Sequence, residues 1–186
     1  NGEATDADGD DMTICWEHYD EDGVNVCPTH GFIGQTAADS DLAPLFRSFP
    51  PTSSTERVFP QMSDIVNGID SDFDVLPNVT RTLTFRMTVR DNNSNGGGMS
   101  CSEVTVDVDD TAGPFEVTLP NGGESYMAGS NITVTWDQAN TSGFCTDVNI
   151  LMSVDGGYNY PFVLATGVTN TDETWTGTIP AGAPNV

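Results

Sequence analysis

Residues 81–110 read RTLTFRMTVRDNNSNGGGMSCSEVTVDVDD. Apolar and polar residues alternate over 82–90 and again over 103–109, which is the pattern of β-strands with one buried and one exposed face. The stretch between them, 91–98, consists mainly of Asn, Ser and Gly, which are typical of turns. These residues predict a β-hairpin with a long tip, whose second strand places Val104, Val106 and Val108 on the buried face.

The same alternation recurs along most of the chain and predicts further strands near residues 12–17, 115–119, 132–136, 148–154 and 175–179. Turn formers and a proline interrupt it at 109–114, which indicates a junction. We therefore predict an all-β fold of two tandem sandwich domains, over residues 1–112 and 113–186.

Residues 25–78 carry no clear strand pattern. Prolines and scattered Ser and Thr separate apolar residues such as Leu45, Phe46 and Phe59. We expect a long ordered loop insertion in the first domain, because a structureless loop of this length is unusual. One helical turn is expected near residues 62–66.

The composition excludes several classes of partner. The 186 residues include five Arg, no Lys and 28 acidic residues, for a formal net charge of −23. A surface of this charge repels nucleic acid and anionic lipid. No apolar stretch approaches the length of a membrane span, so we expect no membrane insertion. The alternating apolar residues argue against disorder.

An acidic run near the N-terminus, residues 6–11, reads DADGDD. Carboxylates this close repel one another unless a cation lies among them, and calcium accepts many oxygen ligands at flexible angles. We predict a calcium site formed by Asp6, Asp8, Asp10 and Asp11, with Asp91 as the remote ligand. The run is no helix-loop-helix calcium loop, because Asp11 occupies the position of the required glycine. A solvated acidic turn is the alternative.

Two resemblances cover most of the chain. The strings ATDADGDDMTICWE, PLFRSFPP, RVFPQMSDI and RTLTFRMTVRDN resemble the polycystic-kidney-disease-like region downstream of the catalytic domain in secreted bacterial zinc metalloproteases of the reprolysin and pappalysin type. The strings GPFEVTLPNGGESYMAGSNITVTWD and VNILMSVDGGYNYPFVLA resemble the immunoglobulin-like module that commonly follows it. The resemblance implies an accessory position in a secreted or cell-surface protein.

This resemblance has limits. The zinc-binding signature His-Glu-x-x-His is missing, and the only histidines are His18 and His30, so the resemblance implies no peptidase activity for this chain. Relative to the resembling modules, we expect both domains to lack terminal strands: the first an opening strand before Asn1, the second two closing strands after Val186. No signal peptide is present, so a mature product or a fragment is expected.

These observations leave two hypotheses for function. The first is a non-catalytic, calcium-stabilised spacer, targeting or binding module, which pairs with other domains of the same polypeptide and binds a carbohydrate or protein surface. The second is a filament or adhesin subunit, in which neighbouring copies complete each sandwich by strand exchange. We find no nucleophile elbow or other catalytic constellation, and we expect no enzymatic activity.

The cysteines allow two interpretations. The repeated Cys-x-x-His spacing, at Cys15 and Cys27, invites a zinc site, but residues three apart on a strand point to opposite faces. An extracellular context favours disulfides, with Cys15, Cys27 and Cys101 as competing partners in the first domain and Cys145 alone in the second. In the resembling modules a cysteine near this position pairs with a cysteine in the closing strands, which would leave Cys145 unpaired here.

Other short patterns indicate candidate sites for carbohydrate binding and for glycosylation. Tyr158 and Tyr160 lie beside the turn at residues 155–157 and could stack on a sugar ring, although packing against their own hairpin is the simpler alternative. Thr111 lies in a short sequence, DTA, that fits a bacterial O-glycosylation pattern. Four Asn-x-Ser/Thr sequons are also present, a pattern that is frequent by chance.

Overall fold

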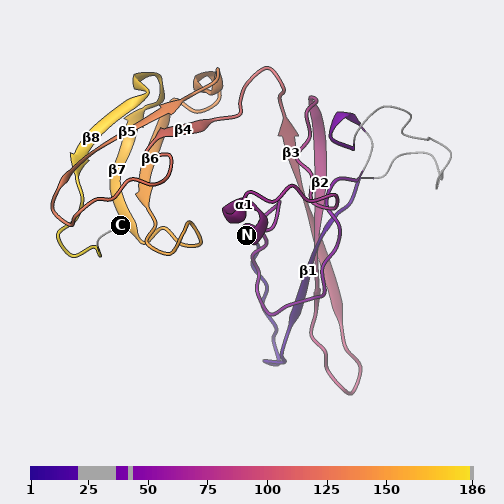
Figure 1. Cartoon of the computed structure of the whole chain (residues 1–186). Helices are drawn as coiled ribbons and strands as arrows, with labels where there is room; N and C mark the ends of the chain where they lie inside the picture. The colour runs from indigo at the N-terminus through magenta and orange to yellow at the C-terminus, as the bar shows by residue number, and fades with distance from the viewer. Residues whose placement is uncertain (21–36, 42–43, 185–186) are drawn as a thin grey trace. The chain divides into compact units, whose positions relative to one another are not determined.

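The computed structural model describes residues 1–20, 37–41 and 44–184. The chain divides into two compact units, Asn1–Asp110 and Thr111–Val186, which are described separately. The predicted boundary lies after residue 112. The all-β prediction is confirmed, since strands dominate both units (Figure 1). Within the described ranges, no helix has the length and apolar character needed to cross a membrane.

The first unit is built on one antiparallel sheet. It contains β1 (Thr13–His18), β2 (Arg81–Arg90) and β3 (Met99–Val108) in the order β1-β2-β3. β2 and β3 pair in unbroken register along their whole length, so the predicted hairpin is confirmed. β2 lies in the centre, with a neighbouring strand on each edge, and it is the most deeply buried of the three strands.

One face of this sheet is covered by the long insertion. Leu45 and Phe46 are buried against Leu83 and Phe85 of β2. Phe59 completes the cluster, with its ring centroid 4.5 Å from that of Phe85. The insertion also holds a short 3₁₀ turn (Ala37–Asp39) and α1 (Met62–Asn67), where the helical turn was expected.

The prediction for β3 is wrong in one respect. Val104 and Val106 are 47% and 45% exposed, whereas Leu83 and Phe85 beside them on β2 are buried. The described part of the insertion covers β2 and leaves β3 at the edge of the sheet. Alternation along β3 therefore indicates an apolar face, but it does not reveal that this face stays half open.

The second unit has two small antiparallel sheets. One contains β4 (Glu116–Leu119), β5 (Asn131–Asp137) and β8 (Thr174–Thr178) in the order β4-β5-β8, and the other pairs β6 (Asp147–Met152) with β7 (Phe162–Thr169). Two 3₁₀ turns, Thr141–Gly143 and Asn170–Asp172, connect them. The core lies between the sheets and consists of Ile132, Val134, Trp136, Ile150, Met152, Ile179 and Ala183.

Candidate functional site

The acidic N-terminal loop is organised by one aspartate. Asp6 Oδ1 accepts the backbone N–H groups of Asp8 and Asp10, at 3.0 and 2.9 Å. These hydrogen bonds lower the pKa of Asp6 below its usual value, and the bond from Asp10 has the largest effect. Asp6 is therefore a turn-forming carboxylate that stays ionised, and its Oδ1 already has two partners.

The tip of the β2–β3 hairpin reaches this loop. Asn93 Nδ2 donates to Asp10 Oδ2 at 2.6 Å, and Asn92 Nδ2 donates to the backbone oxygen of Asp11 at 2.9 Å. The two segments, 83 residues apart at Asp10 and Asn93, meet at one end of the first unit (Figure 1). The hairpin thus contributes amides to the acidic loop.

Asp91, the carboxylate expected to join the loop, instead holds the hairpin's own tip. Its two oxygens accept the N–H of Gly98 at 2.8 and 2.9 Å, and Oδ1 also accepts the N–H of Asn93. A Cβ at Gly97 would lie 2.9 Å from Asp91 Oδ1, so a larger residue there would displace this carboxylate. The hairpin expected to reach the loop does so through Asn93, two positions after Asp91, and calcium ligation by Asp91 stays a prediction.

The oxygen donors of the loop suit calcium, but their arrangement is not a ready coordination shell. In the described ranges, no three His, Cys, Asp or Glu side chains are gathered as metal ligands. Calcium would have to compete with backbone N–H groups for Asp6 Oδ1 and with Asn93 for Asp10 Oδ2. The acidic run contains two further carboxylates, those of Asp8 and Asp11.

A partly buried ionic network lies at the end of β1. Asp20 Oδ2 accepts from His18 Nε2 at 2.7 Å and from Arg81 Nη2 at 2.6 Å, and Asp20 Oδ1 accepts the N–H of Thr84 at 2.7 Å. His18 Nδ1 accepts the N–H of Leu45, so the ring proton lies on Nε2. Burial raises the pKa of Asp20, but these hydrogen bonds outweigh it and the net shift is downward.

This network also decides the zinc hypothesis in β1. His18 faces the side of the sheet that carries Phe85, its register partner, while Cys15 faces the opposite side and donates to the backbone oxygen of Phe49. Burial raises the pKa of the Cys15 thiol, which keeps it protonated. The two side chains therefore do not converge on a metal. Cys27 and His30 lie outside the described residues.

The strand register excludes one of the predicted disulfides. Cys15 and Cys101 both lie opposite Thr88, on either side of β2. Two strand spacings separate them by about 9–10 Å, beyond the roughly 7 Å that a disulfide can span. The Cys15–Cys101 pairing is therefore wrong for this fold. Cys145 is an exposed free thiol whose Sγ donates to the backbone oxygen of Asp147.

The second unit contains an open apolar cleft of about 1110 Å³ between its sheets. The residues of one face of β5, namely Ile132, Val134 and Trp136, form part of its lining. Every residue from Asp147 to Ser153 lines it as well. Since consecutive residues of a strand point to alternate faces, such lining means that the cleft follows the edge of β6.

The lining of the cleft includes a buried asparagine whose side chain is hydrogen-bonded to neutral groups. Asn170 is fully buried, its Nδ2 donates to the backbone oxygen of Cys145 at 2.9 Å, and its Oδ1 accepts from Trp136 Nε1 at 3.1 Å. Sequence reasoning missed Asn170, because an asparagine in a turn is ordinary and only the fold reveals its burial.

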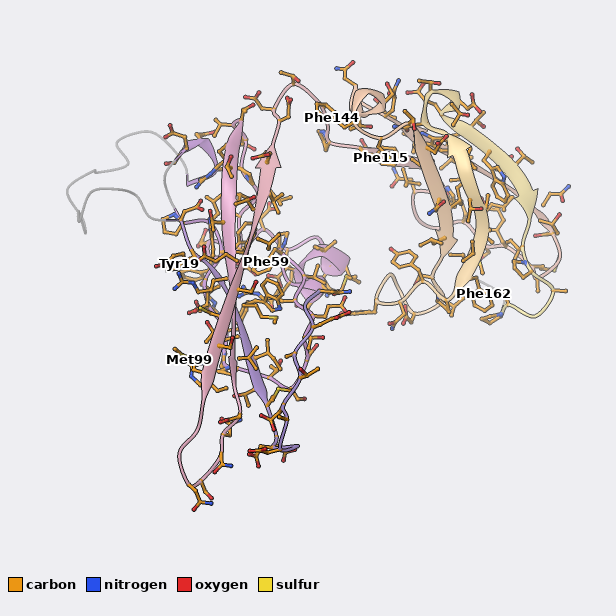
Figure 2. All side chains as sticks on the ribbon, turned by 180° about the vertical axis from the view of Figure 1, so that it is seen from behind. Tyr19, Phe59, Met99, Phe115, Phe144 and Phe162 are labelled. Atoms are coloured by element: carbon orange, nitrogen blue, oxygen red, sulfur yellow. The ribbon has the colours of Figure 1, made fainter. Side chains whose placement is uncertain are left out.

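The two candidate tyrosines have different settings. Tyr160 lines the cleft, whereas Tyr158 is absent from its lining, and both side chains are about half exposed. The turn that precedes them is built around Asp155, which accepts hydrogen bonds from Asn159 and Ser153 that lower its pKa to about 2. Thr111 is exposed at the start of the unit. Figure 2 shows Phe115 and Phe162, which precede β4 and begin β7.

Comparison of the chain with protein-family profiles, curated proteins and solved structures finds no match.

Proposed function

We propose that this chain is a non-catalytic binding or spacer module of a secreted or cell-surface protein, in keeping with the metalloprotease accessory regions that it resembles. The observation that carries the proposal is the apolar cleft along the edge of β6. Its lining is dominated by aliphatic and aromatic side chains, which suit the burial of a partner's apolar groups.

The carboxylates of the cleft support binding over catalysis. Hydrogen bonds from its own backbone N–H, first, and from those of Asn121 and Gly122 lower the pKa of the Glu124 carboxyl. A general acid at neutral pH requires a raised pKa. Glu124 is thus a turn-forming group that remains negative, and the other carboxylate of the lining is Asp147.

Calcium is proposed as the stabiliser of the acidic loop, through oxygens of Asp6, Asp8, Asp10 and Asp11. Binding would also relieve the repulsion within a chain of net charge −23. At a calcium concentration one hundredfold above Kd, one ion raises the free energy of unfolding by roughly 2.7 kcal/mol.

Thermal denaturation in calcium and in chelator tests this proposal. Calcium should raise the melting temperature of the first unit, and Asp10→Ala should remove most of that response. Asp72→Ala is the control, because it removes one negative charge from an exposed position of the same unit. Identical melting with and without chelator, or an undiminished response in Asp10→Ala, would contradict the calcium proposal.

The filament hypothesis is the second candidate, favoured by the half-exposed valines of the edge strand β3. Sedimentation of the purified chain separates the two. The binding or spacer role predicts a discrete monomer at all accessible concentrations, whereas strand exchange predicts oligomers or fibres that resist denaturant.

A further inference from the structure

The edge of β6 that faces away from β7 has no strand partner. β6 pairs only with β7, in a two-stranded sheet, among the strands that the structure describes. An unpaired edge leaves alternate N–H and C=O groups free to bond with another chain. β6 is therefore able to accept one more strand.

The cleft gives such a strand an apolar surface to cover. It runs along the whole of β6 and extends to Phe115 and Val117, which are 41% and 46% exposed. Leu151 of β6 is 45% exposed and also lines it. A strand paired with β6 would direct every second side chain toward the space between the sheets, so alternate apolar residues would fit.

The negative charge of the second unit favours a partner strand that carries positive charge. Residues 111–186 contain no Lys, Arg or His, and Glu124 and Asp147 both line the cleft. A second copy of this chain would bring another −23 charges to the same place, which disfavours self-pairing. An extended segment with Lys or Arg between its apolar residues matches the cleft in both charge and polarity.

We propose that the free edge of β6 accepts an extended basic segment of a partner protein as an additional β-strand, with alternate apolar side chains in the cleft and cationic side chains near Glu124 and Asp147. This inference rests on the binding role proposed above and names its partner class. It requires no calcium.

The test uses the full chain and a synthetic capped peptide of about ten residues in which Val and Lys alternate, a length typical of long strands. Fluorescence anisotropy measures binding, and hydrogen exchange locates it. We expect saturable binding that slows exchange of the β6 amides. Peptides with Glu in place of Lys, or with Ser in place of Val, should bind at least about tenfold more weakly.

Two variants of the chain locate the site. Leu151→Lys places a cation at the edge of the cleft and should weaken binding of the Val-Lys peptide by about tenfold or more. Val163→Lys is the matched control: Val163 lies directly opposite Leu151 on β7, is 58% exposed and does not line the cleft. The affinity of the Val163→Lys chain for the Val-Lys peptide should stay close to that of the native chain.

Three results would overturn the proposal. Equal affinities of the Val-Lys and Ser-Lys peptides would show that charge attraction alone drives binding. An equal loss of affinity in Leu151→Lys and Val163→Lys would show that the peptide binds outside the cleft. Concentration-dependent protection of β6 without peptide would make a second copy the occupant. None of these results bears on calcium-dependent melting. The proposed spacer role can therefore hold even where this inference fails.

Discussion

The two units of this chain hold their cores together by different means. All five arginines lie in the first unit, at positions 47, 57, 81, 86 and 90, and the second has no cationic side chain. The first covers its sheet with an irregular insertion, whereas the second packs two sheets around a neutral core. Within its described residues, the insertion forms only isolated β-bridges, so side-chain contacts help to fix its path, and arginine supplies several of them.

Arginine and phenylalanine side chains stack along the insertion of the first unit. Arg57 lies over the rings of Phe49 and Phe59, at 4.5 and 4.2 Å from their centroids, and Arg47 lies over Phe49 and Phe73. Burial lowers the pKa of Arg57, although Asp74 at 3.6 Å favours its charged form. On the opposite face of the sheet, Arg86 stacks on Tyr19; Figure 2 labels Tyr19 and Phe59. Cations here fix local structure and leave the surface strongly acidic.

The largest effect is expected from breaking the ionic network of the first unit. Asp20→Ala removes the carboxylate that pairs with Arg81, whose side chain is only 2% exposed. Removing one partner of a buried ion pair costs about 3–5 kcal/mol, and hydrogen exchange of the β2 amides measures this loss in the first unit alone. Glu103→Ala breaks the exposed pair with Arg86 and should cost less than about 1 kcal/mol. Equal losses in the two variants would refute the distinction.

A smaller loss is expected from the neutral contact of the second unit. Asn170→Ala leaves the backbone oxygen of Cys145 without its buried partner and should lower the free energy of unfolding by about 2 kcal/mol. Exchange of the β5 amides reports this unit. Asn121→Ala, at an exposed position, is the control and should change stability by less than about 0.5 kcal/mol. A silent Asn170→Ala would show that the amide does not stabilise the core.

The smallest effect concerns the turn around Asp155. Its pKa of about 2 lies below the ordinary aspartate value of 3.8, so the ionised form stabilises the fold. That contribution is present above about pH 4 and is lost as the pH falls toward 2. Asp155→Asn should therefore be less stable than the native chain near neutral pH, and the difference should shrink in acid.

Urea denaturation at several pH values measures this dependence. Asp172→Asn removes the same charge from an exposed position of the same unit and serves as the control. A difference between native and Asp155→Asn that stays constant from neutral pH to about pH 2 would contradict the assigned pKa.

The strands that could be predicted are those whose alternation is uninterrupted. β2 and β5 carry apolar residues at every second position, and both are central strands of their sheets. β7 escaped prediction because its pairing with β6 shifts register twice and Gly167 adopts a φ of 64°. Such irregularities break the period of two on which the prediction depends.

Side-chain partners were harder to predict than strands. The sequence pointed to the acidic loop and to the hairpin beside it, but only the folded register shows that Asn93, two residues after Asp91, contacts Asp10. The exposure of Val104 and the burial of Asn170 likewise depend on what covers them, which no local pattern contains. Calcium binding and the extracellular role remain predictions.

Residue-resolved hydrogen exchange of the free chain tests the central comparison most directly. β2 is paired on both edges from Phe85 to Arg90, so the amides of this stretch should be uniformly slow, whereas alternate amides of β6 should exchange rapidly because they face an open edge. Uniform protection of β6 at the level of β2, in dilute protein without peptide, would contradict the account, because it would show that this edge is already covered.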